Sequence, residues 1–106
     1  MKTLTEIIVH ILKRIFSTRV SFADASYIEY LNREAIMYAE EDGHRMEVVW
    51  YFQLGLMKGR VLYARDIEQW DSPHEMEPLS AIKKEEIQSK IVEYCLKRRI
   101  PLEIKR

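Results

Sequence analysis

Three histidines are the side chains in this sequence best suited to acid–base chemistry or metal binding. His10, His44 and His74 lie far apart along the chain, and none belongs to a motif that supplies a base together with a group to orient it. The segment His74–Glu77 has metal-ligand residue types at close spacing, but a closed zinc site needs about four ligands. We therefore expect each histidine to be structural or solvated, and the sequence predicts no metal.

The single cysteine, Cys95, excludes an internal disulfide and any zinc site built from several thiolates. It falls in the C-terminal half of an expected helix, where the helix dipole disfavours the thiolate that a nucleophile needs. Residues 55–59 lack the glycine-rich start and the Lys-Ser/Thr end of a phosphate-binding loop. We expect Cys95 to be a small core residue, and we expect no catalytic residue, no enzyme activity and no cofactor.

Charge is balanced over the whole chain but not along it. The 17 Lys and Arg residues equal the 17 Asp and Glu residues, so no global field favours nucleic acid or an anionic membrane. Acidic residues gather in segments 24–47 and 66–77, whereas most of the balancing basic residues lie between 83 and 106. The acidic segments are either an ordinary solvated surface or a complement to a basic partner, whose association they would speed and orient.

Trp70 lies inside the second acidic segment, close to Pro73. An aromatic side chain with one polar edge can anchor a protein interface from such a loop. Tryptophan at the exit from a strand can instead plug the end of a sheet, where its indole N–H needs an acceptor. Both roles are open at the level of the sequence.

The clearest periodic element is the N-terminal segment 1–18. Its apolar residues recur at the i, i+3, i+4, i+7 spacing of one helical face, which predicts an amphipathic helix. This helix either packs on the core or forms a self-complementary homodimer interface. Charged residues interrupt it, so it matches neither an export signal nor a membrane span of about 18 apolar residues. We expect a cytoplasmic protein.

Residues 24–43 admit two interpretations. Asp24 could cap a helix that Gly43 ends, or residues 27–31 and 35–40 could form two strands joined by a turn at Asn32 and Arg33. The strand interpretation is favoured because the following run, Met46–Phe52, is β-branched or aromatic from Val48 onward. Such a strand needs a neighbour, which a hairpin through Asp42-Gly43 supplies.

The second half of the chain predicts a strand, a loop, a helix and a last strand. Residues 60–65 have the length and flanks of a strand, and the prolines in residues 66–79 indicate an exposed connection. Ser80 is a suitable N-cap for a helix to about residue 99, which Pro101 stops before a short edge strand at 102–105. The prediction is one α+β domain over residues 1–106, with an N-terminal helix, an antiparallel sheet of about four strands, and a C-terminal helix packed on it.

The expected core draws on both helices and the sheet. It comprises Ile8, Ile11, Ile15, Ile36, Tyr38, Val48, Trp50, Val61, Leu62, Ile87, Ile91 and Cys95.

The stretch from Tyr27 to Ile104 resembles a small α+β family of immunity proteins from bacterial polymorphic-toxin systems. The resemblance rests on a strand hairpin over residues 38–49, a strand ending at residues 61–63, the step Ile67-x-x-Trp70-x-x-Pro73, and a helix rich in Lys, Glu and Ile that follows Ser80. It implies an α+β core over residues 24–106 and a protein that binds a toxin, here expected to be a nuclease delivered by contact-dependent or related secretion, and covers its active site.

The resemblance, taken with the acidic segments, gives a set of expected toxin contacts. Toxins that act on nucleic acid are typically basic around their active sites, and an acidic patch can mimic phosphates there. The expected contact residues are Glu40, Glu41, Asp42, Asp66, Glu68, Trp70, Asp71, Glu75 and Glu77.

Other classes of function make distinct demands. A homo-oligomeric interaction module would use the helix over 1–18. A nucleic-acid adaptor would use the basic residues of segments 97–99 and 105–106 together with Tyr94, although we expect no nucleic-acid partner. A metal-dependent enzyme would need His74, Glu75 and Glu77 to converge with a fourth ligand.

Overall fold

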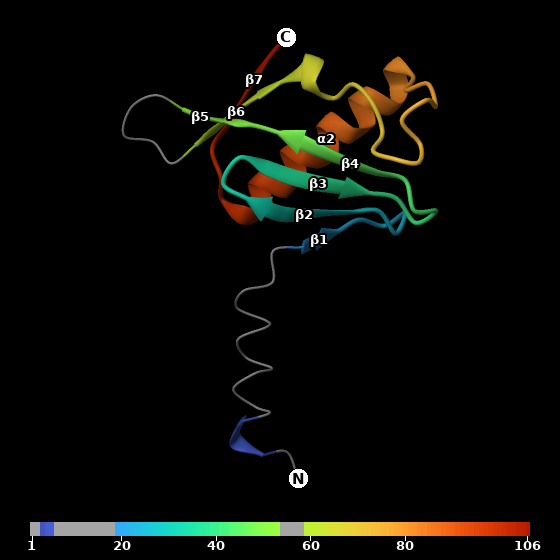
Figure 1. Cartoon of the computed structure of the whole chain (residues 1–106). Helices are drawn as coiled ribbons and strands as arrows, with labels where there is room; N and C mark the ends of the chain where they lie inside the picture. Colours follow the sequence, from blue (N-terminus) through green and yellow to red (C-terminus); the bar gives the residue numbers. More distant parts are fainter. Residues whose placement is uncertain (1–2, 6–18, 54–58) are drawn as a thin grey trace.

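A computed structural model of the chain describes residues 3–5, 19–53 and 59–106. Within these residues the elements follow the order β1 (Arg19–Ser21), β2 (Tyr27–Asn32), β3 (Ala35–Ala39), β4 (Arg45–Val49), β5 (Tyr51–Phe52), β6 (Arg60–Tyr63), the 3-10 helix η1 (Ala64–Asp66), α2 (Ala81–Arg98) and β7 (Leu102–Lys105). The strands form two sheets, and α2 lies behind strands β2 to β4 in the view of Figure 1. The architecture is α+β, as predicted.

The first sheet has the strand order β1-β2-β3-β4, and each strand is antiparallel to its neighbour. The strand interpretation of residues 24–43 is therefore confirmed. Its register places Ile36 opposite Val48 and Tyr38 opposite Met46, so that the buried side chains share one face of the sheet. The short strand β1 was not predicted, because three residues are too few to display an alternation of apolar and polar side chains.

The second sheet, β5-β6-β7, corrects two predictions. The run Met46–Phe52 is not one strand, because the chain leaves the first sheet at Trp50. There the backbone amide of Trp50 donates to the carbonyl of Glu34 and its indole N–H donates to the carbonyl of Arg33, each at 3.0 Å. The last strand, β7, pairs in parallel with β6 of this second sheet, not with the edge of the first.

Helix α2 begins and ends at the predicted signals. The Ser80 hydroxyl accepts the backbone N–H of Lys83, and Arg99 adopts a left-handed conformation at the C-terminus, with φ of 57°, shortly before Pro101. The buried face of the helix carries Ile87, Ile91, Tyr94 and Cys95.

The core lies between α2 and the sheets. All predicted core residues that the structure describes are buried, namely Ile36, Tyr38, Val48, Trp50, Val61, Leu62, Ile87, Ile91 and Cys95. Five further residues of the buried core cluster extend that set, namely Ile28, Met46, Ile67, Trp70 and Tyr94.

The predicted N-terminal helix lies outside the described residues, apart from residues 3–5. Also outside the described residues are three predicted core residues, Ile8, Ile11 and Ile15, together with His10 and the predicted homodimer interface. In the described part of the chain, no helix has the length and apolar character needed to cross a membrane.

Candidate functional site

The turn between β3 and β4 is a tight hairpin built by its own side chains. The backbone amide of Glu40 donates to the carbonyl of His44 at 2.8 Å, and Gly43 supplies the positive φ of 97° that the turn requires. The carboxylate of Asp42 accepts the backbone N–H of His44 at 3.0 Å. The predicted Asp42-Gly43 turn is therefore confirmed, and it fixes the position of the His44 side chain.

The connection that follows η1 returns to this hairpin through Asp71. Its backbone amide donates to the carbonyl of Arg45 at 2.8 Å, and its carboxylate accepts the backbone N–H of Glu47 at 3.1 and 3.3 Å. Asp71 thus satisfies backbone groups along the free edge of β4. The two acidic segments of the sequence consequently meet at one end of the first sheet.

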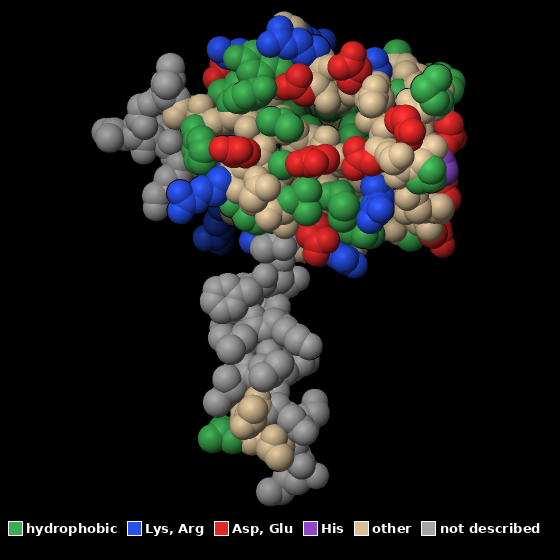
Figure 2. All heavy atoms as spheres, viewed as in Figure 1, with side chains coloured by type: hydrophobic (Ala, Val, Ile, Leu, Met, Phe, Trp, Pro, Cys, Tyr) green, Lys and Arg blue, Asp and Glu red, His purple; other side chains and the backbone are tan. Residues whose placement is uncertain are grey.

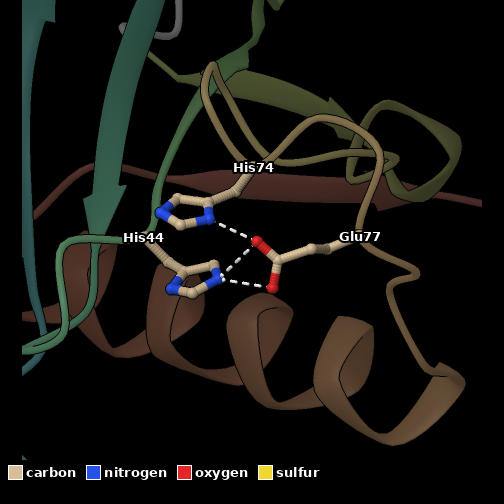
Figure 3. Close-up of side chains that lie close together, drawn as sticks. All are labelled: His44, His74 and Glu77. Atoms are coloured by element: carbon tan, nitrogen blue, oxygen red, sulfur yellow. Dashed lines mark hydrogen bonds and ion pairs between the residues drawn. The ribbon is translucent and has the colours of Figure 1, made fainter.

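A cluster of four side chains closes the junction between hairpin and loop, and Figure 3 shows three of them, His44, His74 and Glu77. His44 Nδ1 lies 2.8 Å from Asp42 Oδ1, and His44 Nε2 lies 3.0 and 3.1 Å from the two oxygens of Glu77. His74 Nδ1 hydrogen-bonds the same Glu77 carboxylate, and its ring stacks on that of His44 with centroids 3.7 Å apart. We call His44, His74, Glu77 and Asp42 the histidine cluster.

The charges of the histidine cluster are coupled. Hydrogen bonding to Glu77 and then to Asp42 raises the pKa of His44, and hydrogen bonding from His44 in turn lowers the pKa of Glu77. A neutral imidazole has one N–H, so it satisfies one carboxylate and turns a lone pair toward the other. Both ring nitrogens of His44 face carboxylates, which makes the site favourable for a positive charge at that ring.

Trp70 lies beneath the cluster. Its side chain is only 5% exposed, and it stacks on Tyr38 with centroids 6.2 Å apart. This burial favours the alternative in which Trp70 plugs the end of the sheet, and it removes Trp70 from the surface where an interface anchor would lie. A direct contact between Trp70 and a toxin stays a prediction, and this burial does not favour it.

Glu40 is also partly withdrawn from the surface. Its carboxylate accepts hydrogen bonds from the Tyr38 hydroxyl and from the Lys83 ammonium, both at 2.8 Å. Lys83 belongs to α2, so this ion pair ties the hairpin to the helix and neutralises Glu40. Glu40 therefore contributes less to the field at the hairpin tip than its exposed neighbour Glu41.

The remaining predicted contact residues divide into two groups. Five exposed acidic residues share the end where hairpin and loop meet, and we call them the acidic end: Glu41, Asp42, Asp71, Glu75 and Glu77. Histidine side chains appear among acidic ones at the right-hand edge of the space-filling view (Figure 2). Asp66 does not join this group, because η1, which holds it, lies well away from the hairpin tip in Figure 1; Glu68 is an exposed residue between η1 and Trp70.

Convergence of two histidines is the feature that the sequence did not reveal. A metal-dependent enzyme would have needed His74, Glu75 and Glu77 to converge, whereas the structure joins His74 and Glu77 to His44 and leaves Glu75 exposed. His44 is 33 positions from Glu77 in the sequence, so no local spacing signals the contact. The only hint was the acidic character of both segments.

A second exposed surface lies on the small sheet. Tyr51 and Phe52 are 49% and 53% exposed, and they line a shallow hollow together with Tyr63 and Glu103. The basic C-terminal end of α2 is a third surface, but Tyr94 is fully buried there. Tyr94 therefore does not offer its ring to a nucleic-acid base, which weakens the adaptor interpretation.

Comparison with known proteins gave one family. Residues 31–105 match the family model described as immunity protein 74. No curated protein and no solved structure matched the chain. The matched residues run from the end of β2 through the hairpin, the loop and α2 to β7, so they contain both the acidic end and the histidine cluster.

Proposed function

Because the chain belongs to the immunity protein 74 family, we propose that it binds a cognate bacterial toxin and neutralises it by covering the toxin's active site. The family match is the observation that carries this proposal. The protein would act as a binding partner and not as an enzyme, as a single domain in the cytoplasm, where a toxin delivered by a neighbouring cell would arrive.

We further propose that the toxin is a nuclease and that it docks on the acidic end. A nuclease groove attracts polyanions, and a fixed array of carboxylates can occupy it in place of phosphates. The hydrogen bonds of Asp71 and Asp42 hold the hairpin and the loop in place before any partner arrives. Such preorganisation lowers the ordering cost of binding.

The five carboxylates of the acidic end differ in whether they also accept hydrogen bonds within the protein. Asp42, Asp71 and Glu77 accept hydrogen bonds within the protein, so substituting them disturbs the loop as well as the charge. Glu41 precedes Asp42 and Glu75 follows His74 in the sequence, and both side chains are exposed. These two are the cleanest probes of charge complementarity.

The first experiment is co-expression with the product of the adjacent upstream reading frame. A stable complex and restored growth are the expected results. Growth arrest despite co-expression, with no complex on size exclusion, would contradict the proposal for that pair and favour a homo-oligomeric interaction module.

The docking surface is tested by charge reversal in the complex. The double variant Glu41→Lys/Glu75→Lys should slow association by about tenfold or more and alter its salt dependence. Glu103→Lys is the matched control, because Glu103 is an exposed acid on β7 beside the aromatic residues of the small sheet. If Glu103→Lys weakens the complex and the double variant does not, the toxin docks on the small sheet and the acidic end is not the interface.

A further inference from the structure

The histidine cluster offers three metal-ligand atoms in one place. His44 Nε2, His74 Nδ1 and a Glu77 oxygen belong to a group whose ligand atoms all lie within 4.8 Å of one another. They come from two segments that the fold brings together, the β3–β4 turn and the loop before α2 (Figure 3). The toxin docking proposed above uses the carboxylates of the acidic end and none of these nitrogens.

We propose that His44, His74 and Glu77 bind one divalent transition-metal ion, Zn²⁺ in the first instance, with water completing a four-coordinate site. Two imidazole nitrogens and one carboxylate oxygen are donors that zinc accepts. The metal site shares Glu77 and Asp42 with the proposed docking surface, but metal binding is measured on the chain without a toxin, so the failure of one proposal does not decide the other.

The separation of His44 from Glu77 suits such an ion, whereas the stacked rings of His44 and His74, with centroids 3.7 Å apart, must turn before both nitrogen lone pairs point at one ion. Zinc bonds of about 2.0–2.1 Å at tetrahedral angles place two donor atoms about 3.3 Å apart. His44 Nε2 lies 3.0 and 3.1 Å from the Glu77 oxygens, so the two ligands need to separate by only a few tenths of an ångström. The side chain of Glu77 is half exposed and can make that adjustment, and its exposure also gives the metal a path from solvent.

Asp42 is the positioning residue of the site. It lies 2.8 Å from His44 Nδ1 and so holds a proton on that nitrogen, which leaves the Nε2 lone pair directed at the metal position. Trp70 supports the same ring from below, with its centroid 5.1 Å from that of His44. A carboxylate behind the ligand and a buried aromatic beneath it are the supports that fix an imidazole for metal binding.

Charge also favours this group over a neighbouring one. Glu40, Asp42 and His44 form a second set of nearby ligand atoms, but Glu40 is already paired with the Lys83 ammonium at 2.8 Å. In the proposed group, the ion takes the place of a proton between His44 Nε2 and Glu77, and it meets two carboxylates, that of Glu77 and that of Asp42 behind His44. A divalent cation neutralises both carboxylates.

The test measures metal binding by the full chain after chelator treatment. Equilibrium dialysis with metal analysis should find one tightly held Zn²⁺ per chain, and Co²⁺ should give the visible absorption of a four-coordinate ion. Glu77→Gln and His74→Gln should abolish or greatly weaken binding. Asp42→Asn should weaken binding by about 10- to 100-fold, since it removes only the support behind His44.

Two control variants locate the ion. Glu75→Gln changes an exposed acid of the same loop outside the cluster, and His10→Gln removes the remaining histidine of the chain. Both should bind as the unaltered protein does. Binding that survives Glu77→Gln and His74→Gln, or that disappears in His10→Gln, would overturn the proposal, as would an unaltered chain that retains no metal.

Thermal unfolding separates loss of the site from loss of the fold. Zn²⁺ should raise the Tm of the unaltered protein, because an ion that binds only the folded state stabilises it, and should leave that of Glu77→Gln unchanged. A Zn²⁺-induced rise in the Tm of Glu77→Gln equal to that of the unaltered protein would place the ion elsewhere. The metal-free Tm values report whether each variant folds.

Discussion

The imidazole ring of His44 meets the indole ring of Trp70 edge to face, with centroids 5.1 Å apart. His44 belongs to the exposed hairpin turn, whereas Trp70 is buried and packs with Tyr38 in the core. The acidic end therefore rests directly on the hydrophobic core. Any change that loosens Trp70 should also loosen the arrangement of carboxylates above it.

Trp70→Ala should lower the free energy of unfolding by about 3–5 kcal/mol, the cost of emptying a large buried aromatic site. Urea denaturation followed by circular dichroism measures this loss. Glu68→Ala is the matched control, because Glu68 is exposed two residues earlier and should stay within about 0.5 kcal/mol of the unaltered protein. Equal effects of the two substitutions would contradict the core role of Trp70.

Lys90 connects α2 to the first sheet and should be a second stabilising centre. Its ammonium donates to Asp24, to the buried Ser26 and to Glu86, while its side chain is only 12% exposed. Lys90→Met should lower the free energy of unfolding by about 1–3 kcal/mol, because it leaves these acceptors without their donor. The same denaturation measurement applies.

Lys97→Met is the control for that substitution. Lys97 pairs with Glu93 one helical turn away at 3.2 Å, and both side chains are about half exposed. Such surface pairs contribute about 0–1 kcal/mol. A larger loss for Lys97→Met than for Lys90→Met would show that burial does not decide the strength of these ion pairs.

Stability should fall in acid through Asp24. Hydrogen bonds from Lys90 and then from Ser26 hold the pKa of Asp24 well below its usual range. Its folded-state pKa is thus lower than its unfolded value of about 3.9, so its contribution is present above that pH and is lost as the pH falls through the folded value. The contribution is at most about 1 kcal/mol, because the carboxylate is half exposed and screened.

Asp24→Asn checks this sign. The variant should be less stable than the unaltered protein at pH 7, and the difference should shrink as urea unfolding is repeated at pH values descending below about 4. A difference that grows toward acid would mean that Asp24 does not act through its ionised form.

Cys95 should be unreactive in the folded protein. It is 2% exposed, and burial raises the pKa of its thiol to about 11. A thiol reagent at pH 8 should therefore label Cys95 only as fast as the protein opens, with labelling becoming rapid in urea. Rapid labelling without denaturant would contradict its placement in the core.

The sequence alone determined the local elements. The β-branched and aromatic residues of 48–52, the Asp42-Gly43 turn, the Ser80 cap and Pro101 each act within a few residues, so strands β2, β3 and β6, helix α2 and strand β7 could be predicted. The described core residues followed from the same local patterns. The resemblance to immunity proteins rested on short motifs such as Ile67-x-x-Trp70-x-x-Pro73, and the family match over residues 31–105 confirms it.

Only the tertiary structure decided which distant segments meet. The division of Met46–Phe52 between two sheets depends on carbonyls of the β2–β3 turn that accept both N–H groups of Trp50. The histidine cluster depends on Asp71, which docks the loop on the edge of β4 and so brings His74 and Glu77 to His44. Local preferences carry no information about such contacts, because their geometry is set by hydrogen bonds and packing between residues far apart in the chain.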